Sequence, residues 1–316
     1  MIDKALFIIN LISGTGKQEV FLNILSEVFD KSRYAYDTVY TKYSGHATEL
    51  SKNAIKNYGL VVAVGGDGTV NEVVKGLVGS DCVMGIVPVG SGNGLARHLR
   101  LPIKIKESLQ VINEGKTQRI DTGTLNEKPF VNVAGIGFDA HIAHMFANSK
   151  KRGAIPYAKI ATQEFQKYES KKYEIIIEEK TYHIKAFLIS FANSTQFGNN
   201  AYISPNAIIN DGLLDFCILS EFPKIEAGQM AIKLFNKRMD KSKYMNIIRG
   251  TSITIKGTHN LCGHIDGEPI TLSNQIEVKI NKASLRVIYN SNISMLESIS
   301  NKIKSIESDI FKNPLQ

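Results

Sequence analysis

The sequence predicts two domains: an α/β domain with a doubly wound parallel sheet, followed by a β-rich domain built as an antiparallel sandwich. Over the first third of the chain, short apolar strands alternate with helical patterns, and glycine-rich turns follow three of the strands. After about residue 120 the apolar segments become short and turn-bounded, as in antiparallel sheets. The length of 316 residues suffices for about two domains.

The N-terminal elements follow one another in a βα pattern. Residues 60–64, LVVAV, are wholly apolar, which is typical of a strand buried on both faces of a parallel sheet. In residues 20–29, Phe21, Leu25 and Val28 fall on one helical face. The expected strands are residues 6–9, 37–40, 60–64 and 82–87, and the expected helices are residues 20–29, 46–58 and 70–77.

The second half is expected to be mostly strands. These are residues 130–134, 173–178, 183–192, 213–219, 252–256, 276–280 and 285–289, with helices at 140–147, 157–168 and 225–235. Residues 293–311 form an amphipathic helical pattern that is expected to pack back on the body. We therefore divide the chain into domains at 1–122 and 123–292, with a C-terminal helix in 293–316.

Composition limits the classes of function. Hydrophobic residues make up 43% and charged residues 22% of the chain, as in a globular protein with a real core. The net charge of +8 favours an anionic partner, either nucleic acid, a nucleotide or an acidic membrane surface. The basic surplus is spread out without a nucleic-acid motif, so no nucleic-acid partner is expected. No apolar run approaches the ~18 residues that span a bilayer.

The three cysteines, Cys82, Cys217 and Cys262, are far apart and form no CxxC pair. This pattern indicates neither a zinc ribbon nor a disulfide framework. We expect buried, reduced thiols in a cytoplasmic protein.

The segment VGGDGTVNE at residues 64–72 is the strongest chemical signal. Gly65, Gly66 and Gly68 stand where a strand turns into a helix, so that backbone amides can approach an anion closely. Thr69 adds a hydroxyl, and the helix dipole favours negative charge at the same place. A carboxylate repels phosphate, so Asp67 is interpreted as a magnesium anchor or a proton acceptor, with a helix-capping turn residue as the alternative.

Two further glycine-rich turns follow strands of the same sheet. The first, residues 10–17, resembles a P-loop but has Leu11 where that loop needs glycine and Gln18 where it needs Ser or Thr. It still offers Lys17 for phosphate contact. The second, residues 88–96, carries a GSGNG run. Ligands of open α/β sheets bind outside the carboxyl ends of the strands, so the three turns are expected to converge on one crevice.

The ordered motifs NxxSGxGK, GGDGTVNE and PVGSGNGLA resemble the diacylglycerol kinase catalytic family, which includes sphingosine, ceramide and bacterial soluble lipid kinases. The resemblance continues through residues 133–140, 205–215 and 265–268, and so covers essentially the whole chain. It implies that ATP binds in a cleft between the two domains. By similarity, the ATP contacts are Asn10, Ser13, Gly14, Lys17, Thr41, Gly65, Gly66, Asp67, Gly68, Thr69, Asn71, Glu72, Ser91, Gly92 and Asn93.

The resemblance also implies catalytic and metal-binding residues. Glu268 is the expected proton acceptor, with Asp266 and Asp67 as rival candidates. Mg²⁺ is expected with ATP, and a structural Mg²⁺ is expected on the Asp211 carboxylate and the carbonyls of Ile208 and Leu213.

Plainer interpretations stay open for several of these residues. Asn210–Gly212 also fits an ordinary hairpin turn, and Asp266–Gly267 is a good turn dipeptide. Asp139 could hold a substrate hydroxyl or cap the following helix. Glu268 can act as the base only if it faces the glycine-rich crevice.

The resulting hypothesis is an ATP-dependent lipid kinase that phosphorylates a lipid hydroxyl, with diacylglycerol as first choice. Gly94 stands where many bacterial diacylglycerol kinases have Asp, which makes a long-chain base such as sphingosine the alternative. An NAD kinase shares GGDGT, but the SGNGLA and DGE segments argue against it. An inactive lipid-binding homologue is disfavoured because the three carboxylates are present. We expect peripheral contact with the inner face of the membrane, and a homodimer is an assembly to be considered.

Overall fold

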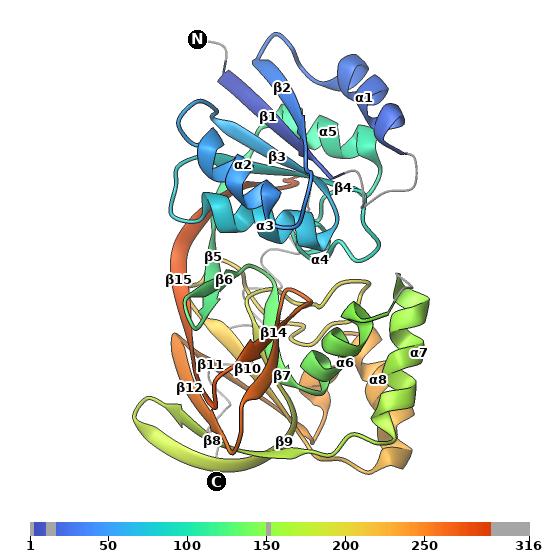
Figure 1. Cartoon of the computed structure of the whole chain (residues 1–316), viewed down its shortest axis with the longest axis vertical. Coiled ribbons are helices and arrows are strands. Elements are labelled where there is room, and N and C mark those ends of the chain that lie inside the picture. The colour runs from blue at the N-terminus through green and yellow to red at the C-terminus, as the bar shows by residue number, and fades with distance from the viewer. Residues whose placement is uncertain (1–2, 11–16, 150–152, 292–316) are drawn as a thin grey trace.

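The computed structural model describes residues 3–10, 17–149 and 153–291 and shows two domains stacked end to end (Figure 1). The upper domain is the α/β part, and the lower domain is the β-rich part. The predicted fold class is therefore confirmed. The helix predicted within 293–316 lies outside the described residues.

The N-terminal sheet is parallel, with helices on both faces. Its strands lie in the order β2 (Tyr34–Tyr40), β1 (Asp3–Ile9), β3 (Leu60–Gly65) and β4 (Val83–Pro88). The helices are α1 (Lys17–Val28), α2 (His46–Ala54), α3 (Asp67–Leu77), α4 (Gly94–His98) and α5 (Ile105–Glu114). Helix α3 begins at Asp67, three residues earlier than expected, so the aspartate belongs to the first turn of the helix.

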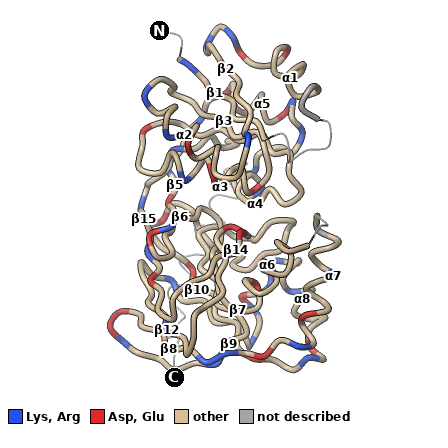
Figure 2. The backbone as a smooth tube through the Cα atoms, viewed as in Figure 1, with Lys and Arg blue, Asp and Glu red and all other residues tan. Residues whose placement is uncertain are grey.

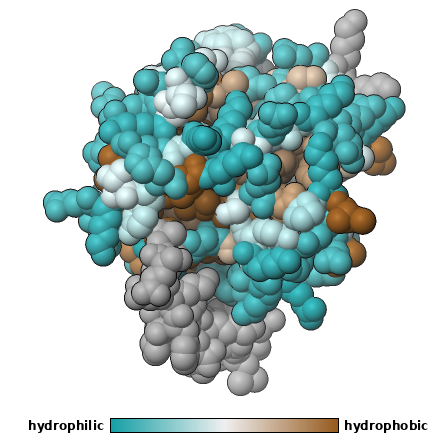
Figure 3. Space-filling view, turned by 90° about the horizontal axis from the view of Figure 1, so that it is seen from below, coloured by the Kyte–Doolittle hydropathy of each residue, from teal (hydrophilic) through white to brown (hydrophobic). Residues whose placement is uncertain are grey.

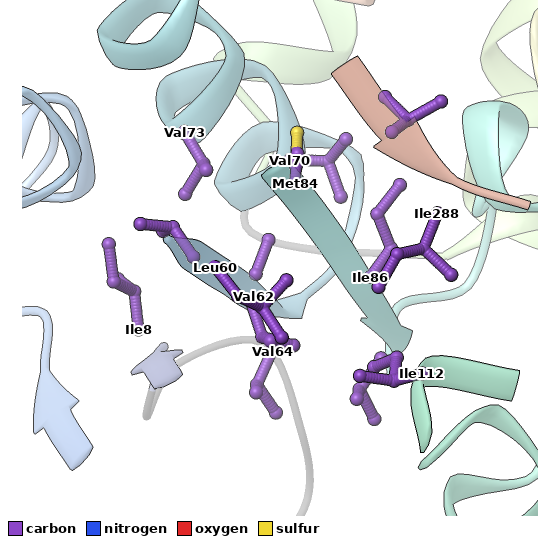
Figure 4. Close-up of a cluster of buried hydrophobic side chains, with 14 of the residues drawn as sticks. Ile8, Leu60, Val62, Val64, Val70, Val73, Met84, Ile86, Ile112 and Ile288 are labelled. Carbon is purple, nitrogen blue, oxygen red and sulfur yellow. The ribbon is translucent and has the colours of Figure 1, made fainter. Parts of the chain in front are cut away.

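Branched aliphatic side chains hold this domain together. Leu60, Val62 and Val64 of β3 are at most 2% exposed and meet side chains of α3, β4 and α5 (Figure 4). Each such side chain contributes about 1.5–3 kcal/mol when fully buried. Strand β3 is thereby a rigid support for the turn that follows it.

A two-stranded ribbon joins the domains. Strand β5 (Thr117–Leu125) runs antiparallel to β15 (Gln275–Ile288), whose end pairs with β4 and whose beginning pairs with β12 (Ser252–Gly257). The two strands predicted at 276–280 and 285–289 are thus one strand, which corrects the prediction. A register shift between Asn281 and Leu285, where Ala283 has a φ of 47°, bends it. The proposed boundary at residue 122 falls inside β5 and stays a prediction.

The C-terminal domain is antiparallel throughout. Its strands follow the order β14 (Glu268–Leu272), β13 (Leu261–Ile265), β7 (Val133–Gly137), β9 (Lys180–Ala192), β8 (Lys171–Ile177), β12 and β15. Strands β10 (Leu214–Ser220) and β11 (Met245–Gly250) extend from β9, and the short β6 (Lys128–Phe130) pairs with β5. Phe130, Phe191 and Phe216 are fully buried in its core.

Helices line one side of this domain (Figure 1). They are α6 (Phe138–Ala147), α7 (Ala154–Phe165) and α8 (Ala227–Phe235), with the 3-10 turns η1 (Lys224–Glu226) before α8 and η2 (Met239–Lys241) after it. Among the described helices, none is long and apolar enough to cross a membrane.

Candidate functional site

Two glycine-rich turns touch backbone to backbone at the carboxyl ends of β3 and β4. A β-carbon on Gly90 would lie 2.5 Å from the α-carbon of Gly66, and one on Gly65 would lie 2.4 Å from the β-carbon of Thr69. These distances are too short for any side chain. The two turns therefore pack against each other only because Gly66 and Gly90 have no side chain, and Gly65 leaves room for Thr69.

Asp67 ties the two turns together. Its Oδ2 accepts a hydrogen bond from the Asn93 amide at 2.8 Å, and its Oδ1 accepts one from the Gly94 amide at 2.6 Å. Burial raises the pKa of Asp67, and these two hydrogen bonds act in the opposite direction. Asp67 thus accepts from the first amides of α4. It caps α4 and not α3, the helix to which it belongs.

Asn93 closes the second turn on itself. Its Oδ1 accepts from the Gly90 amide at 3.1 Å, its Nδ2 donates to the Gly90 carbonyl at 2.8 Å, and its φ of 52° is left-handed. Ser91, at the tip of this turn, is exposed. A β-carbon on Gly94 would lie 2.3 Å from Asn132 Nδ2, so the Asp that many bacterial diacylglycerol kinases carry there would require Asn132 to move.

Two other predicted contacts lie beside these turns. Asn10, at the end of β1, donates from Nδ2 to Thr69 Oγ1 at 2.9 Å. Thr41, just after β2, donates its amide to the Ile9 carbonyl at 2.9 Å. The strand ends thus bring Asn10, Thr41 and Thr69 to one edge of the sheet. Ser13, Gly14 and the side chain of Lys17 lie outside the described part of the chain.

The two polar side chains after GGDGT have partners in other elements. Glu72 accepts from the Gly45 amide at 2.8 Å and from the Ala47 amide at 3.0 Å. It therefore caps α2, whose own N-cap residue Gly45 has no side chain to do so. Asn71 donates from Nδ2 to Asp266 Oδ2 at 2.6 Å and so reaches the C-terminal domain.

Asp266 locks the hairpin turn between β13 and β14. With φ values of 48° for Asp266 and 87° for Gly267, this is the turn that the dipeptide predicted. Its carboxylate accepts four hydrogen bonds, from the amides of Val131, Asn132 and Val133 and from the Asn71 side chain. Burial raises its pKa, and these hydrogen bonds act in the opposite direction. A carboxylate so fully engaged is suited to positioning its neighbour Glu268.

Glu268 faces the glycine-rich turn from the other domain. A β-carbon on Gly68 would lie 3.4 Å from Glu268 Oε1, while Oε2 is 3.5 Å from Lys75 Nζ. The Glu268 side chain is 44% exposed, so a substrate can reach it. Burial raises its pKa, Lys75 lowers it, and the Glu72 and Asp266 carboxylates raise it further. Glu268 thus borders the same turn as Asp67, as the hypothesis requires.

Sequence reasoning missed Lys75 and His264. Lys75 lies seven residues after Gly68 on α3, and this spacing puts both on one helix face, so periodicity could have identified it. His264 lies two residues before Asp266 and is buried. Its Nδ1 accepts from the Gly267 amide at 3.3 Å, and its Nε2 lies 3.2 Å from Asp139 Oδ2. His264 thus supports the turn that carries Glu268.

Asp139 is part of this buried support. It accepts from Ser190 Oγ at 2.7 Å and from the Ala140 amide at 2.8 Å, at the start of α6. These contacts give Asp139 a structural role within α6, although Gly137 is the N-cap of that helix, and leave its contact with a substrate hydroxyl a prediction.

The predicted structural metal residues lie on a separate loop. Asp211 Oδ1 accepts from the Leu213 amide at 3.0 Å, and Oδ2 pairs with Arg249, whose Nε also reaches Asp215 at 3.2 Å. Burial raises the pKa of Asp211 and of Asp215, and Arg249 opposes this. Within the described residues, no group of three or more His, Cys, Asp or Glu could hold a metal. The Arg249 guanidinium is the cation that Asp211 contacts in this structure, and Ile208, Asp211 and Leu213 as metal ligands stay a prediction.

Known proteins share both halves of this architecture. Residues 4–125 match the model of the diacylglycerol kinase catalytic domain, and residues 132–289 match that of the YegS C-terminal NAD kinase beta sandwich-like domain. A probable lipid kinase YegS-like of Chromohalobacter salexigens is 31% identical over 66% of this chain and 69% of its own length. The diacylglycerol kinase of Bacillus subtilis is 28% identical over 80% of this chain and 87% of its own.

The similarity extends to solved structures. The crystal structure of a putative diacylglycerol kinase from Bacillus anthracis superposes with a TM-score of 0.76. It is 22% identical and covers 92% of this chain and 96% of that one. This likeness supports the two-domain fold.

Proposed function

This chain belongs to the diacylglycerol kinase catalytic family and is a lipid kinase, and on that basis we propose that it transfers the γ-phosphoryl group of ATP to the hydroxyl of diacylglycerol, giving phosphatidic acid. One observation carries the proposal: Glu268 of the β-rich domain borders Gly68 of the glycine-rich turn in the α/β domain. This closeness supports the proposal, because phosphoryl transfer needs a proton acceptor beside the turn that binds the phosphates.

The glycine-rich turns suit the phosphates of ATP. The N-terminus of α3, an 11-residue helix, follows the Gly65–Gly66 turn, and its free amides and dipole favour an anion. Asn10, Thr41 and Ser91 lie around the same strand ends and could contact the nucleotide.

Mg²⁺ fits this site as a companion of the nucleotide phosphates. Mg²⁺ in kinases commonly uses one or two carboxylates together with phosphate oxygens and water. Both oxygens of Asp67 accept hydrogen bonds from backbone amides, so Asp67 would hold the ion through a water molecule. Bound there, the ion would neutralise phosphate charge.

Glu268 is the residue best placed to receive the proton of the lipid hydroxyl. As the lipid oxygen bonds to the γ-phosphorus, the bond from that phosphorus to the β–γ bridging oxygen breaks, ADP leaves and the hydroxyl proton passes to Glu268. Burial raises the Glu268 pKa, which suits a general base, while Lys75 acts in the opposite direction. Asp266 and His264 hold the turn in place.

Gly94 keeps a long-chain base as a second candidate substrate. Its close packing against Asn132 distinguishes this turn from the version with Asp. Both substrates present a hydroxyl to the same base, so the chemistry would be the same.

A substrate panel tests the proposal. Purified protein is given labelled ATP with diacylglycerol, monoacylglycerol, sphingosine, ceramide, phosphatidylglycerol, undecaprenol or NAD, in the presence and absence of Mg²⁺. We expect phosphatidic acid as the main product, formed only with Mg²⁺. A main product from sphingosine would transfer the proposal to long-chain bases, and phosphorylation of NAD alone would refute it. No turnover of any acceptor would indicate an inactive homologue.

A further inference from the structure

Helix α8 is apolar on its inner and its outer side. Met230 and Leu234 pack inward against the core of the β-rich domain. Ile225 in η1, Ile232 and Phe235 are 93%, 62% and 55% exposed. Their spacing of seven and three residues places these three on one face of a helix. We call these three side chains the α8 apolar face.

Basic residues surround this face. Six basic and only two acidic residues lie between positions 224 and 243. Of the acidic two, Glu226 is 3.7 Å from Lys243 and Asp240 is 3.4 Å from Lys241. Lys237 lies over the Tyr202 ring at 4.7 Å instead of facing a carboxylate. The surroundings of the face are therefore net positive, and blue segments of the backbone border α8 (Figure 2).

The face stands out from a mostly hydrophilic surface. Seen from below, brown side chains project at the right-hand edge, the side on which α7 and α8 lie in Figure 1 (Figure 3). Isolated exposed apolar residues are ordinary, but three on the consecutive helices η1 and α8, within a lysine-rich segment, are typical of a surface that enters a lipid interface.

The same helix is connected to the phosphate-binding turns. The Tyr202 amide donates to the Leu234 carbonyl at 2.9 Å, near the end of α8. The Asn199 amide, in the same loop, donates to the Gly92 carbonyl at 3.3 Å. The end of α8 is therefore one short loop away from the turn that Asp67 holds.

We propose that the α8 apolar face, with its flanking lysines, docks on the surface of an anionic lipid bilayer. This rests on the proposed function, because an enzyme that phosphorylates diacylglycerol must meet a water-insoluble acceptor at a lipid interface. The positive charge around the face favours an anionic bilayer over a second copy of this chain as the partner. It attracts anionic headgroups, each basic residue strengthening the contact, whereas a second copy of this chain would bring like charges together.

Vesicle binding tests the docking face. Full-length protein is sedimented with vesicles of phosphatidylcholine alone or mixed with phosphatidylglycerol, and Ile232→Ser/Phe235→Ser is compared with wild type. Ile103→Ser is the matched control, because Ile103 is 42% exposed in the other domain. We expect binding only to the anionic vesicles, at least about tenfold weaker in the double variant and unchanged in the control. Lys233→Gln/Lys237→Gln should reduce the anionic preference.

Kinase activity separates this inference from the proposed function. On short-chain diacylglycerol dissolved in water, the double variant should match wild type, whereas on vesicle-borne diacylglycerol its KM should rise. Equal vesicle binding by the double variant and wild type would overturn the inference. It would also be overturned if wild type were a dimer in solution and the double variant a monomer that still bound vesicles. Vesicle binding that depends on this face, without turnover of diacylglycerol, would uphold the docking face and refute the proposed substrate.

Discussion

Three carboxylates lie near the glycine-rich turn, and their hydrogen-bond partners distinguish their roles. Asp67 accepts from two backbone amides, and Asp266 accepts from four donors. Glu268 accepts from a single lysine and is the least buried of the three. The first two therefore hold loops together, and the third is free to take a proton.

Lys75 should set the pH at which Glu268 becomes active. Lys75 lowers the Glu268 pKa, so Lys75→Met should raise it. A general base works as the carboxylate, so kcat/KM rises as pH rises through this pKa. The acid limb of the pH profile should therefore move to higher pH in Lys75→Met and stay in place in Lys75→Arg. Identical profiles for all three proteins would show that Lys75 does not act on the base.

Asp266→Asn should destabilise the fold. An amide side chain cannot accept from all four donors, and each buried donor left without an acceptor costs about 1–3 kcal/mol. Urea unfolding should show this loss. A free energy of unfolding within about 0.5 kcal/mol of wild type would contradict the positioning role.

At the scale of elements, the site depends on turns that follow parallel strands. The apolar residues 60–64 and the glycines that follow them were sufficient to predict β3 and its turn. Partners distant in sequence could not be predicted in the same way. Glu72 looks like an ATP contact within GGDGTVNE, but it serves α2 because Gly45 leaves that helix without a cap. Strand β15 looked like two strands because its bend at Ala283 interrupts the pattern.

Gly90→Ala should disturb both glycine-rich turns. The new methyl group would meet the Gly66 backbone at 2.5 Å, and such overpacking costs about 1–3 kcal/mol. We expect lower stability in urea and weaker ATP binding by calorimetry. Gly228→Ala is the control, because no atom lies within 4 Å of its β-carbon position. Normal ATP affinity in Gly90→Ala would show that the contact between the turns is not needed for binding.

Arg249, not a metal ion, should stabilise the loop at Asp211. Both ion pairs of Arg249 are at most 22% exposed, and removing one partner of such a buried pair costs about 3–5 kcal/mol. Arg249→Gln should therefore lower the free energy of unfolding by about that amount. Arg119→Gln is the control, because the ion pair of Arg119 with Asp81 is exposed. This change should have little effect on the free energy of unfolding.

Removal of metal ions by a chelator tests whether Arg249 or Mg²⁺ stabilises the loop at Asp211. The melting temperature of wild-type protein should be the same in EDTA and in Mg²⁺. A marked rise with Mg²⁺ would instead support the metal ligands that the resemblance implied.

At the scale of the whole molecule, one ribbon positions the two halves of the site. Strands β5 and β15 extend from the parallel sheet to the sandwich, and the Asp121 carboxylate on β5 accepts from the Ala283 amide at 2.6 Å, at the bend. The sequence could predict two domains, because each has its own hydrophobic pattern. It could not show that Glu268 meets Gly68, because that contact depends on how the ribbon sets one domain against the other.

The most direct test of the shared site is the behaviour of Glu268→Gln. Single-turnover transfer from labelled ATP to short-chain diacylglycerol is measured together with ATP affinity, using the exposed Glu277→Gln as control. Loss of the base should slow transfer by about 100- to 10,000-fold while ATP affinity and stability stay as in wild type. Transfer at the wild-type rate would show that Glu268 and the glycine-rich turn do not form one catalytic site.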